Sequence, residues 1–287
     1  MKILNPILLL KFSLEGGKGS PKFLLSHKRM NFTFGIVTAG DMEDRIRAIV
    51  DSIIAQQIPT YEILIVGDCK ATDLGDKVTI LPFDETVKRG WLTRKKNLIC
   101  QRAAYETVVL LHDYIRLEPG WYEGFLRFGD NFQICVTPVL THTAGRFRDF
   151  TLYPWGLEAP FQERCLIPYT ANIPDHSRKL LYISGAYYII KRNTSLQEPL
   201  DERLVHCAGD DVEFTQRLAR RGVLIQCNPY SQVKFLKWKE QCNWEHEIRP
   251  EDLATLCNLS EERANRLFES QCSHLKGWIA SNFGVSI

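Results

Sequence analysis

The chain has 287 residues, a formal net charge of +2 and a hydrophobic fraction of 45%. This length is enough for one large folded domain, alone or with a small addition. A dedicated nucleic-acid-binding protein would carry a strongly basic face or tail, so the near-neutral charge argues against a nucleic-acid partner. It leaves room for a local basic pocket that binds phosphate.

Nine cysteines are scattered along the sequence, without a CxxC pair or a short cluster of cysteine and histidine. This pattern is typical of reduced, buried thiols rather than of a disulfide framework or a zinc site. We therefore expect a cytoplasmic protein, with the cytoplasmic membrane face left open as an alternative location. The apolar run 7–10 is too short to span a bilayer, so no transmembrane segment is expected.

The first part of the chain predicts alternating strands and helices. Residues 32–38 are β-branched and aromatic, as in a buried strand, and 41–57 carry apolar residues at helical spacing. Strands are expected next over 62–66, 78–81 and 107–111, with a helix over 95–105. Apolar strands joined through helices predict a mostly parallel sheet with helices on both faces.

The second part of the chain is less regular. Residues 141–180 are rich in proline, aromatic and charged residues and are too long for a simple connection, which favours a segment that shapes a site. Strands are expected over 134–139, 186–190 and 223–227, and helices over 210–221, 251–257 and 261–280. We therefore expect an α/β domain over 32–235, preceded by an extension over 1–31 and followed by a helical appendage over 236–287.

Polar residues follow several of the predicted strands directly. Thr38 and Gly40 follow the first strand, Asp68 follows the second, and His112 and Asp113 follow the strand over 107–111. Ligands of open parallel sheets bind beyond the carboxyl ends of the strands, so these residues are candidates for a shared site. The alternative is that they are ordinary turn residues.

Asp113 is the strongest metal-ligand candidate. A carboxylate directly after a buried strand can hold Mn²⁺ or Mg²⁺, which in turn binds a diphosphate. The alternative is that Asp113 caps the turn that leads to Arg116. We interpret His112 as a hydrogen-bonding neighbour rather than as a ligand.

A basic cluster precedes this strand and includes Lys95 and Lys96, followed by Asn97. Such a cluster can neutralise phosphate, although a solvated basic loop explains it equally well. The sequence has neither a GxxxxGK[ST] motif nor a GxGxxG motif, so phosphate binding would depend on side chains and a metal.

Asp210 and Asp211 open the predicted helix over 210–221. Acidic residues stabilise a helix N-terminus, which is the purely structural interpretation. The functional interpretation is that one of the two carboxylates is a general base.

In this order and spacing, the motifs resemble those of family 2 glycosyltransferases of GT-A fold, over about residues 32–228. The matching segments are 34–38 with 52–57, 63–68, Lys96-Asn97, 108–115, and Gly209-Asp210-Asp211-Val212 with Arg217-Leu218. The resemblance implies a Rossmann-like mixed, mostly parallel sheet and an inverting, metal-dependent transfer of a sugar from a nucleoside diphosphate to an acceptor hydroxyl. It implies donor-binding residues at Thr38, Gly40, Asp68, Lys95, Asn97, His112 and Gly185, and catalytic residues at Asp211 and Asp210.

The sequence departs from the family at its metal motif. The family usually has Asp-x-Asp where only Asp113 supplies a carboxylate here. Either a further ligand is therefore expected, with His246 and His206 as candidates, or the metal is weakly bound or absent. The incomplete motif also supports an alternative, a catalytically silent relative that binds nucleotide or glycan.

The acceptor side is less defined by the sequence. A glycan, a lipid-linked acceptor and a small molecule all stay open as acceptors. Aromatic residues such as Tyr153 and Trp155 are interpreted either as acceptor platforms or as core. The C-terminal helices are expected to form a lid, an oligomer contact or an acceptor surface, and low charge disfavours a DNA-reading helix pair there.

Overall fold

The computed structural model describes residues 29–40, 42–88, 90–237 and 245–287, and its centre is a seven-stranded sheet. The strand order is β12-β6-β11-β4-β1-β2-β3. These strands are β1 (Phe32–Val37), β2 (Tyr61–Val66), β3 (Val78–Leu81), β4 (Thr107–His112), β6 (Ile134–Val136), β11 (Tyr187–Lys191) and β12 (Ile225–Cys227). Only β11 runs antiparallel to its neighbours, β4 and β6, which confirms the predicted mixed, mostly parallel sheet.

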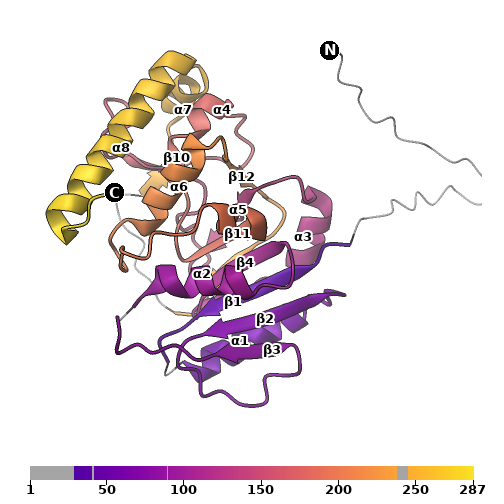
Figure 1. Ribbon diagram of the computed structural model, residues 1–287. Helices are drawn as coiled ribbons and strands as arrows, with labels where there is room; N and C mark the ends of the chain where they lie inside the picture. Colours follow the sequence, from indigo (N-terminus) through magenta and orange to yellow (C-terminus); the bar gives the residue numbers. More distant parts are fainter. Residues whose placement is uncertain (1–28, 41, 89, 238–244) are drawn as a thin grey trace, which may run out of the picture.

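Helices cover both faces of this sheet (Figure 1). Helix α1 (Glu43–Ile54) packs Ile46 and Ile49 into the same core cluster as Ile63 and Ile65 of β2. Helix α2 (Leu92–Arg102) packs instead into the cluster that holds Leu64 and Val66 of the same strand. Because successive strand residues point to opposite faces, this alternation explains why the strands are apolar throughout.

Two smaller sheets are built mostly from elements that the sequence did not predict, although β7 begins at the end of the strand predicted over 134–139. They are β10-β8-β9-β14, with β8 (Thr151–Leu152), β9 (Arg164–Leu166), β10 (Leu181–Tyr182) and β14 (Glu245–Glu247), and β5-β13-β7, with β5 (Ile115–Leu117), β7 (Val139–Leu140) and β13 (Val233–Phe235). The remaining helices are α3 (Trp121–Phe128), α4 (Asp175–Arg178), α5 (Arg192–Gln197), α6 (Asp210–Arg220), α7 (Pro250–Cys257) and α8 (Glu261–Phe283). Strands of two or three residues are too short to leave a periodic pattern in a sequence.

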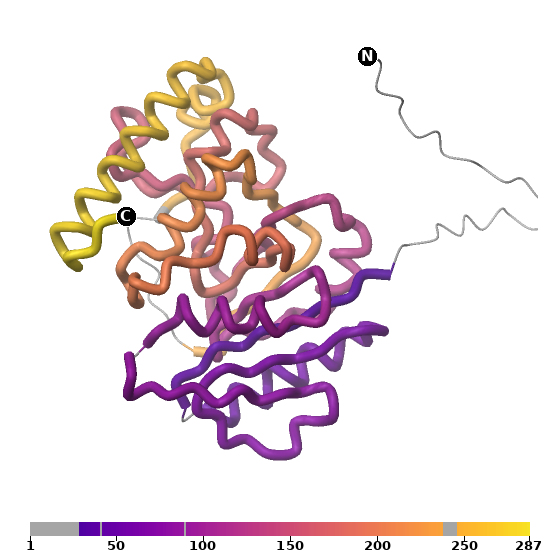
Figure 2. The backbone as a smooth tube through the Cα atoms, in the orientation of Figure 1, coloured from indigo at the N-terminus to yellow at the C-terminus, as the bar shows by residue number. Residues whose placement is uncertain are grey.

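The C-terminal helices share the core of the sheet domain. Leu256 of α7 and Phe268 of α8 belong to the same buried cluster as Val108 of β4 and Phe214 of α6. In Figure 2 the C-terminal helix lies beside the segment that carries α6, and α6 and α8 are in contact. The appendage predicted over 236–287 is therefore physically joined to the rest of the domain. Residues 1–28 of the predicted extension lie outside the described residues.

In the described part of the chain, none of the helices combines the length and the apolar character that crossing a membrane requires.

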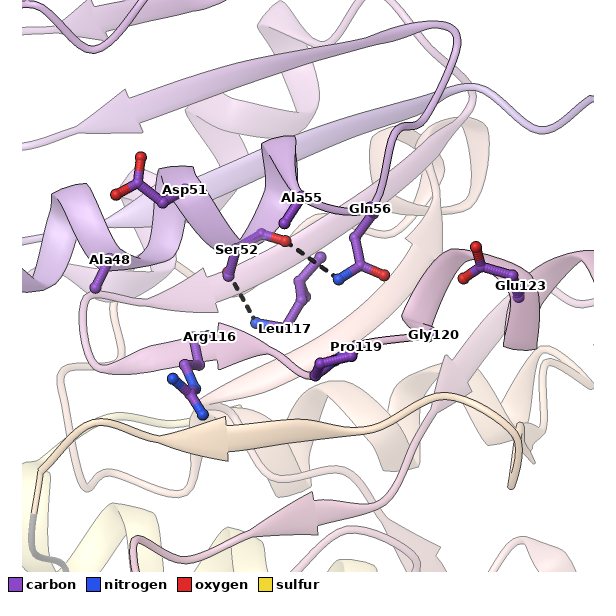
Figure 3. Close-up of a pocket in the computed structure, with 10 residues that line it drawn as sticks. All are labelled: Ala48, Asp51, Ser52, Ala55, Gln56, Arg116, Leu117, Pro119, Gly120 and Glu123. Carbon is purple, nitrogen blue, oxygen red and sulfur yellow. Dashed lines mark hydrogen bonds between the residues drawn. The ribbon is translucent and has the colours of Figure 1, made fainter.

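A concave region of about 480 Å³ lies between α1 and the 116–123 segment (Figure 3). Its polar side chains join the two elements: Ser52 Oγ accepts a hydrogen bond from Leu117 N at 3.1 Å. The Gln56 amide donates to the carbonyl of Glu118 at 3.1 Å and accepts from Tyr122 N at 3.2 Å. Ser52 and Gln56 belong to the segment that resembles the family, and here that segment has a structural role.

Gln56→Ala is expected to lower the free energy of unfolding by about 1–3 kcal/mol, because it leaves the Tyr122 N–H without its acceptor, whereas the Glu118 carbonyl keeps the bond from Trp121 N at 3.2 Å. Urea denaturation measures this loss. Asp51→Ala, at an exposed position of α1 shortly before Gln56, should change stability by less than about 0.5 kcal/mol. An equal loss in both variants would contradict the structural role of the Gln56 amide.

Candidate active site

The carboxyl ends of β1, β2 and β4 bring together four predicted residues, which we name the strand-end cluster: Thr38, Gly40, Asp68 and Asp113. Thr38 Oγ1 donates to Asp113 Oδ2 at 2.8 Å and accepts from Gly40 N at 3.1 Å. Gly40 has φ +100°, and a Cβ there would lie 2.9 Å from the Asp68 carbonyl oxygen. Glycine therefore allows the chain to pass against Asp68, as the strand-end pattern predicts.

Lys95 supports this cluster from the neighbouring helix α2. Its side chain is completely buried, forms an ion pair with Glu85, and donates from Nζ to the Thr38 carbonyl at 2.6 Å. Asn97 lies on the same helix and is also buried. Its amide donates to the Leu200 carbonyl at 2.9 Å and accepts from Leu200 N at 2.9 Å, which fixes the loop before α6. Direct donor contacts of Lys95 and Asn97 stay predictions.

A cavity of about 370 Å³ lies next to the strand-end cluster and contains most of the remaining predicted residues. Its lining includes Leu92, Lys96, His112, Tyr114, Arg148, Trp155, Arg164, Ser184, Gly185, Ala186, His206, Cys207, Gly209, Asp210, Asp211 and Trp278. His112 and Tyr114 line the cavity on either side of Asp113 in sequence, and His112 Nδ1 lies 3.1 Å from the Tyr114 hydroxyl. Asp113 itself is not among the lining residues, whereas both of its sequence neighbours are, so the strand-end cluster adjoins the cavity that contains Asp211.

The N-terminus of α6 fixes Asp211 against Gly185. Asp211 Oδ2 accepts a hydrogen bond from Gly185 N at 2.9 Å, and Oδ1 accepts from Val212 N at 2.9 Å. Lys96 Nζ donates to the Gly185 carbonyl at 2.7 Å. A Cβ at Gly185 would lie 3.3 Å from the Asp211 side chain and 3.5 Å from Lys96 Nζ. The backbone of Gly185 thus lies between the Asp211 carboxylate and the Lys96 ammonium group.

Burial and charge together set the electrostatics of this cavity. Burial, reinforced by the neighbouring Asp211 carboxylate, raises the pKa of Asp210 to about 6 against the opposing effect of Lys96. Burial lowers the pKa of Lys96, while Asp210 and Asp211 act in the opposite direction. A carboxyl pair next to a buried ammonium group is an arrangement suited to proton transfer near neutral pH.

The raised pKa of Asp210 predicts a pH dependence of stability. The folded state binds this proton more tightly than the unfolded state, so stability falls as the pH rises from about 4 through about 6. Asp210→Asn removes this effect, and we expect it to be about 2 kcal/mol more stable than the natural chain at pH 7.5 and equally stable at pH 4. Urea denaturation at the two pH values measures the difference. A variant that is less stable at pH 7.5 would mean that the Asp210 charge stabilises the fold.

The predicted metal ligands Asp113 and His246 do not form a complete protein site. His246 lies on β14, where Nε2 is 3.1 Å from Glu163 Oε2 and 3.8 Å from Cys165 Sγ. Among the described residues, no group of three or more histidine, cysteine, aspartate or glutamate side chains is arranged to hold a metal. Mg²⁺ and similar cations are often held by one or two carboxylates together with substrate phosphates, so Asp113 still fits that use.

Several cavity residues have no counterpart among the predicted site residues. Lys96 is adjacent to the predicted Lys95, but the two side chains leave the helix in different directions and reach different partners. The segments that carry Arg148, Arg164 and Trp278 are far from the motifs in sequence. Only the aromatic, irregular character of 141–180 indicated that this segment shapes a site.

The central sheet and the helices that cover it form the GT-A fold that the sequence resemblance predicts, as the comparison with solved structures shows. Among solved structures, GalNAc-T7 with UDP, GalNAc and Mn²⁺ matches 89% of this chain and 51% of its own at 14% identity, with a TM-score of 0.56. The 1–349 part of S. aureus TarS matches 88% of this chain and 74% of its own at 14% identity, with a TM-score of 0.48. No family model and no curated protein matches the sequence. This chain spans about half the length of the GalNAc-T7 chain.

Proposed function

We propose that this protein is a glycosyltransferase that moves a sugar from a nucleoside diphosphate to an acceptor hydroxyl. The observation that carries the proposal is the pair Asp210–Asp211, which lines a cavity at the sheet edge next to the strand-end cluster. The nucleoside is assigned to Thr38, Gly40 and Asp68, and the sugar to the cavity beside Gly185. The likeness to GalNAc-T7 supports the fold on which this assignment rests.

Asp211 is the proposed general base. It lines the cavity and is less buried than Asp210, so an acceptor hydroxyl can reach it. As the acceptor oxygen attacks the anomeric carbon, Asp211 takes its proton and the bond to the diphosphate oxygen breaks, with inversion at that carbon. Asp210, Lys96 and Gly185 hold the base in place and set the charge around it.

Asp113 is the proposed ligand of Mn²⁺ or Mg²⁺. When bound, such a cation would stabilise the negative charge that grows on the leaving diphosphate. The Thr38 hydroxyl holds one Asp113 oxygen at 2.8 Å and thereby orients the carboxylate. His246 is retained as a second ligand only as a prediction from the sequence.

A thermal-shift panel of nucleoside diphosphates and nucleotide sugars, with and without Mn²⁺, tests this proposal. Uridine diphosphate is the first probe, because the GalNAc-T7 structure contains UDP. Binding at about 100 times the dissociation constant adds about 2.7 kcal/mol, so a rise of several degrees is expected for the correct nucleotide with Mn²⁺. No rise with any nucleotide would contradict donor binding.

The second candidate function is a silent relative that binds nucleotide or glycan without transfer. The observation that favours it is the single carboxylate of Asp113 where the family has two. Nucleotide binding is compatible with both candidates, so turnover is the observation that separates them.

A further inference from the structure

Two tryptophan side chains from distant parts of the chain line the cavity that contains Asp211. Trp155 lies in the loop after β8, and Trp278 lies near the end of α8. Their ring centroids are 5.8 Å apart with an interplanar angle of 56°. Trp155 is 40% exposed although it is a large aromatic residue. We name this pair the aromatic wall.

Helix α8 holds the aromatic wall against the carboxylate pair. Gly209 precedes Asp210 with φ +73°, and a Cβ there would lie 3.5 Å from Trp278 Cζ3. The Gln271 amide donates to the carbonyls of Tyr153 and Leu180, the latter at 3.2 Å, so α8 also fixes the chain next to Trp155. Contacts of α8 with Gly209 and with the chain next to Trp155 therefore fix both tryptophan residues at the cavity.

We infer that the aromatic wall is the acceptor subsite and that the acceptor is a carbohydrate, one of whose sugar rings stacks on the exposed Trp155 while Trp278 borders the same subsite at an angle. This inference rests on the proposed function, in which the attacking hydroxyl must lie next to Asp211. An indole ring offers an apolar face to the C–H face of a sugar, while the polar lining of the cavity bonds its hydroxyls. This cavity contains both an apolar ring face and polar side chains, which are the two features that binding of a sugar requires.

Other acceptor classes fit the cavity less well. A lipid chain needs an extended apolar groove, whereas charged residues such as Lys96, Arg164 and Asp210 line this cavity. A nucleobase would also stack on indole, but the nucleoside is assigned to Thr38, Gly40 and Asp68 of the strand-end cluster, none of which lines this cavity. A volume of about 370 Å³ is near the lower end for ligand pockets, which suits the end of a glycan.

Saturation-transfer NMR with methyl glycosides of glucose, galactose, GlcNAc and GalNAc tests the inference without any donor. At least one glycoside should bind the natural chain through one face of its ring. Trp155→Ala should weaken that binding about tenfold, and Trp155→Phe should largely retain it. Tyr230→Ala is the matched control, because Tyr230 is 43% exposed and its ring contacts Arg127 instead of the cavity.

The inference is overturned if no glycoside binds, or if Trp155→Ala binds as tightly as the natural chain. Thermal unfolding of each variant shows whether it is still folded. Trp155→Phe keeps an aromatic ring at this position, so weaker binding by a folded Trp155→Ala alone indicates loss of the ring contact with the sugar. The outcome is independent of the donor test. Glycoside binding with no nucleotide binding would leave the wall as a carbohydrate site and remove the transferase proposal, whereas nucleotide turnover with an unaffected Trp155→Ala would remove only the wall.

Discussion

Asp211→Asn is expected to reduce sugar transfer by about 10²–10⁴-fold while leaving nucleotide affinity unchanged. The amide cannot take the proton of the acceptor hydroxyl, but its oxygen still accepts the hydrogen bond that Gly185 N donates at 2.9 Å, and only the local bond from Val212 N to the second oxygen is lost. The cavity should therefore keep its shape. Release of nucleoside diphosphate measures the rate, and calorimetric titration with UDP measures the affinity.

Glu213→Gln is the matched control for this substitution. Glu213 lies on the same helix and is buried, but it pairs with Arg217 at 2.8 Å and does not line the cavity. The control variant should retain transfer at close to the natural rate once folded. If Asp211→Asn instead lost nucleotide binding, Asp211 would belong to the donor site and its role as base would be wrong.

Asp113→Asn is expected to remove the Mn²⁺-dependent part of nucleotide affinity and to lower kcat/KM by about 10²–10³-fold. A divalent cation supplies several kcal/mol of charge stabilisation on a leaving diphosphate, and Asp113 is the carboxylate of the strand-end cluster that the Thr38 hydroxyl orients. Titrations with UDP in Mn²⁺ and in EDTA measure the loss.

The EDTA titration provides the internal control for Asp113. Natural chain and variant should bind UDP equally without metal, because the Thr38 hydroxyl can still donate to the amide oxygen of the substituted side chain. Asp84→Asn, at an exposed carboxylate that bonds Thr86, should change neither titration. A variant that keeps the full Mn²⁺ effect would exclude Asp113 as the metal ligand.

Much of the sheet and of the strand-end cluster could be predicted from the sequence. Strands such as β1 and β4 are buried on both faces, so their sequences are nearly continuous runs of apolar residues. In a parallel arrangement the residues after these runs must meet at one edge, which is why Thr38 and Asp113 were found together. The acidic pair at α6 was predicted because it opens a strongly periodic helix.

The rest of the cavity depends on long-range packing that leaves no local pattern. Trp278 reaches the site because α8 packs on Gly209, which lies far earlier in the chain. Successive helix residues point in directions about 100° apart, so the sequence alone did not tell which of Lys95 and Lys96 faces the cavity. His246 was placed by analogy, and its contacts with Glu163 and Cys165 were not predictable from its motif.

The most direct test of the central claim is the release of free nucleoside diphosphate from a panel of nucleotide sugars with Mn²⁺, using the natural chain, Asp113→Asn and Asp211→Asn in parallel. The account predicts release by the natural chain with at least one donor and a loss of at least about a hundredfold in both variants, with UDP affinity kept only in Asp211→Asn. Nucleotide binding without release by the natural chain would contradict it and establish the silent relative.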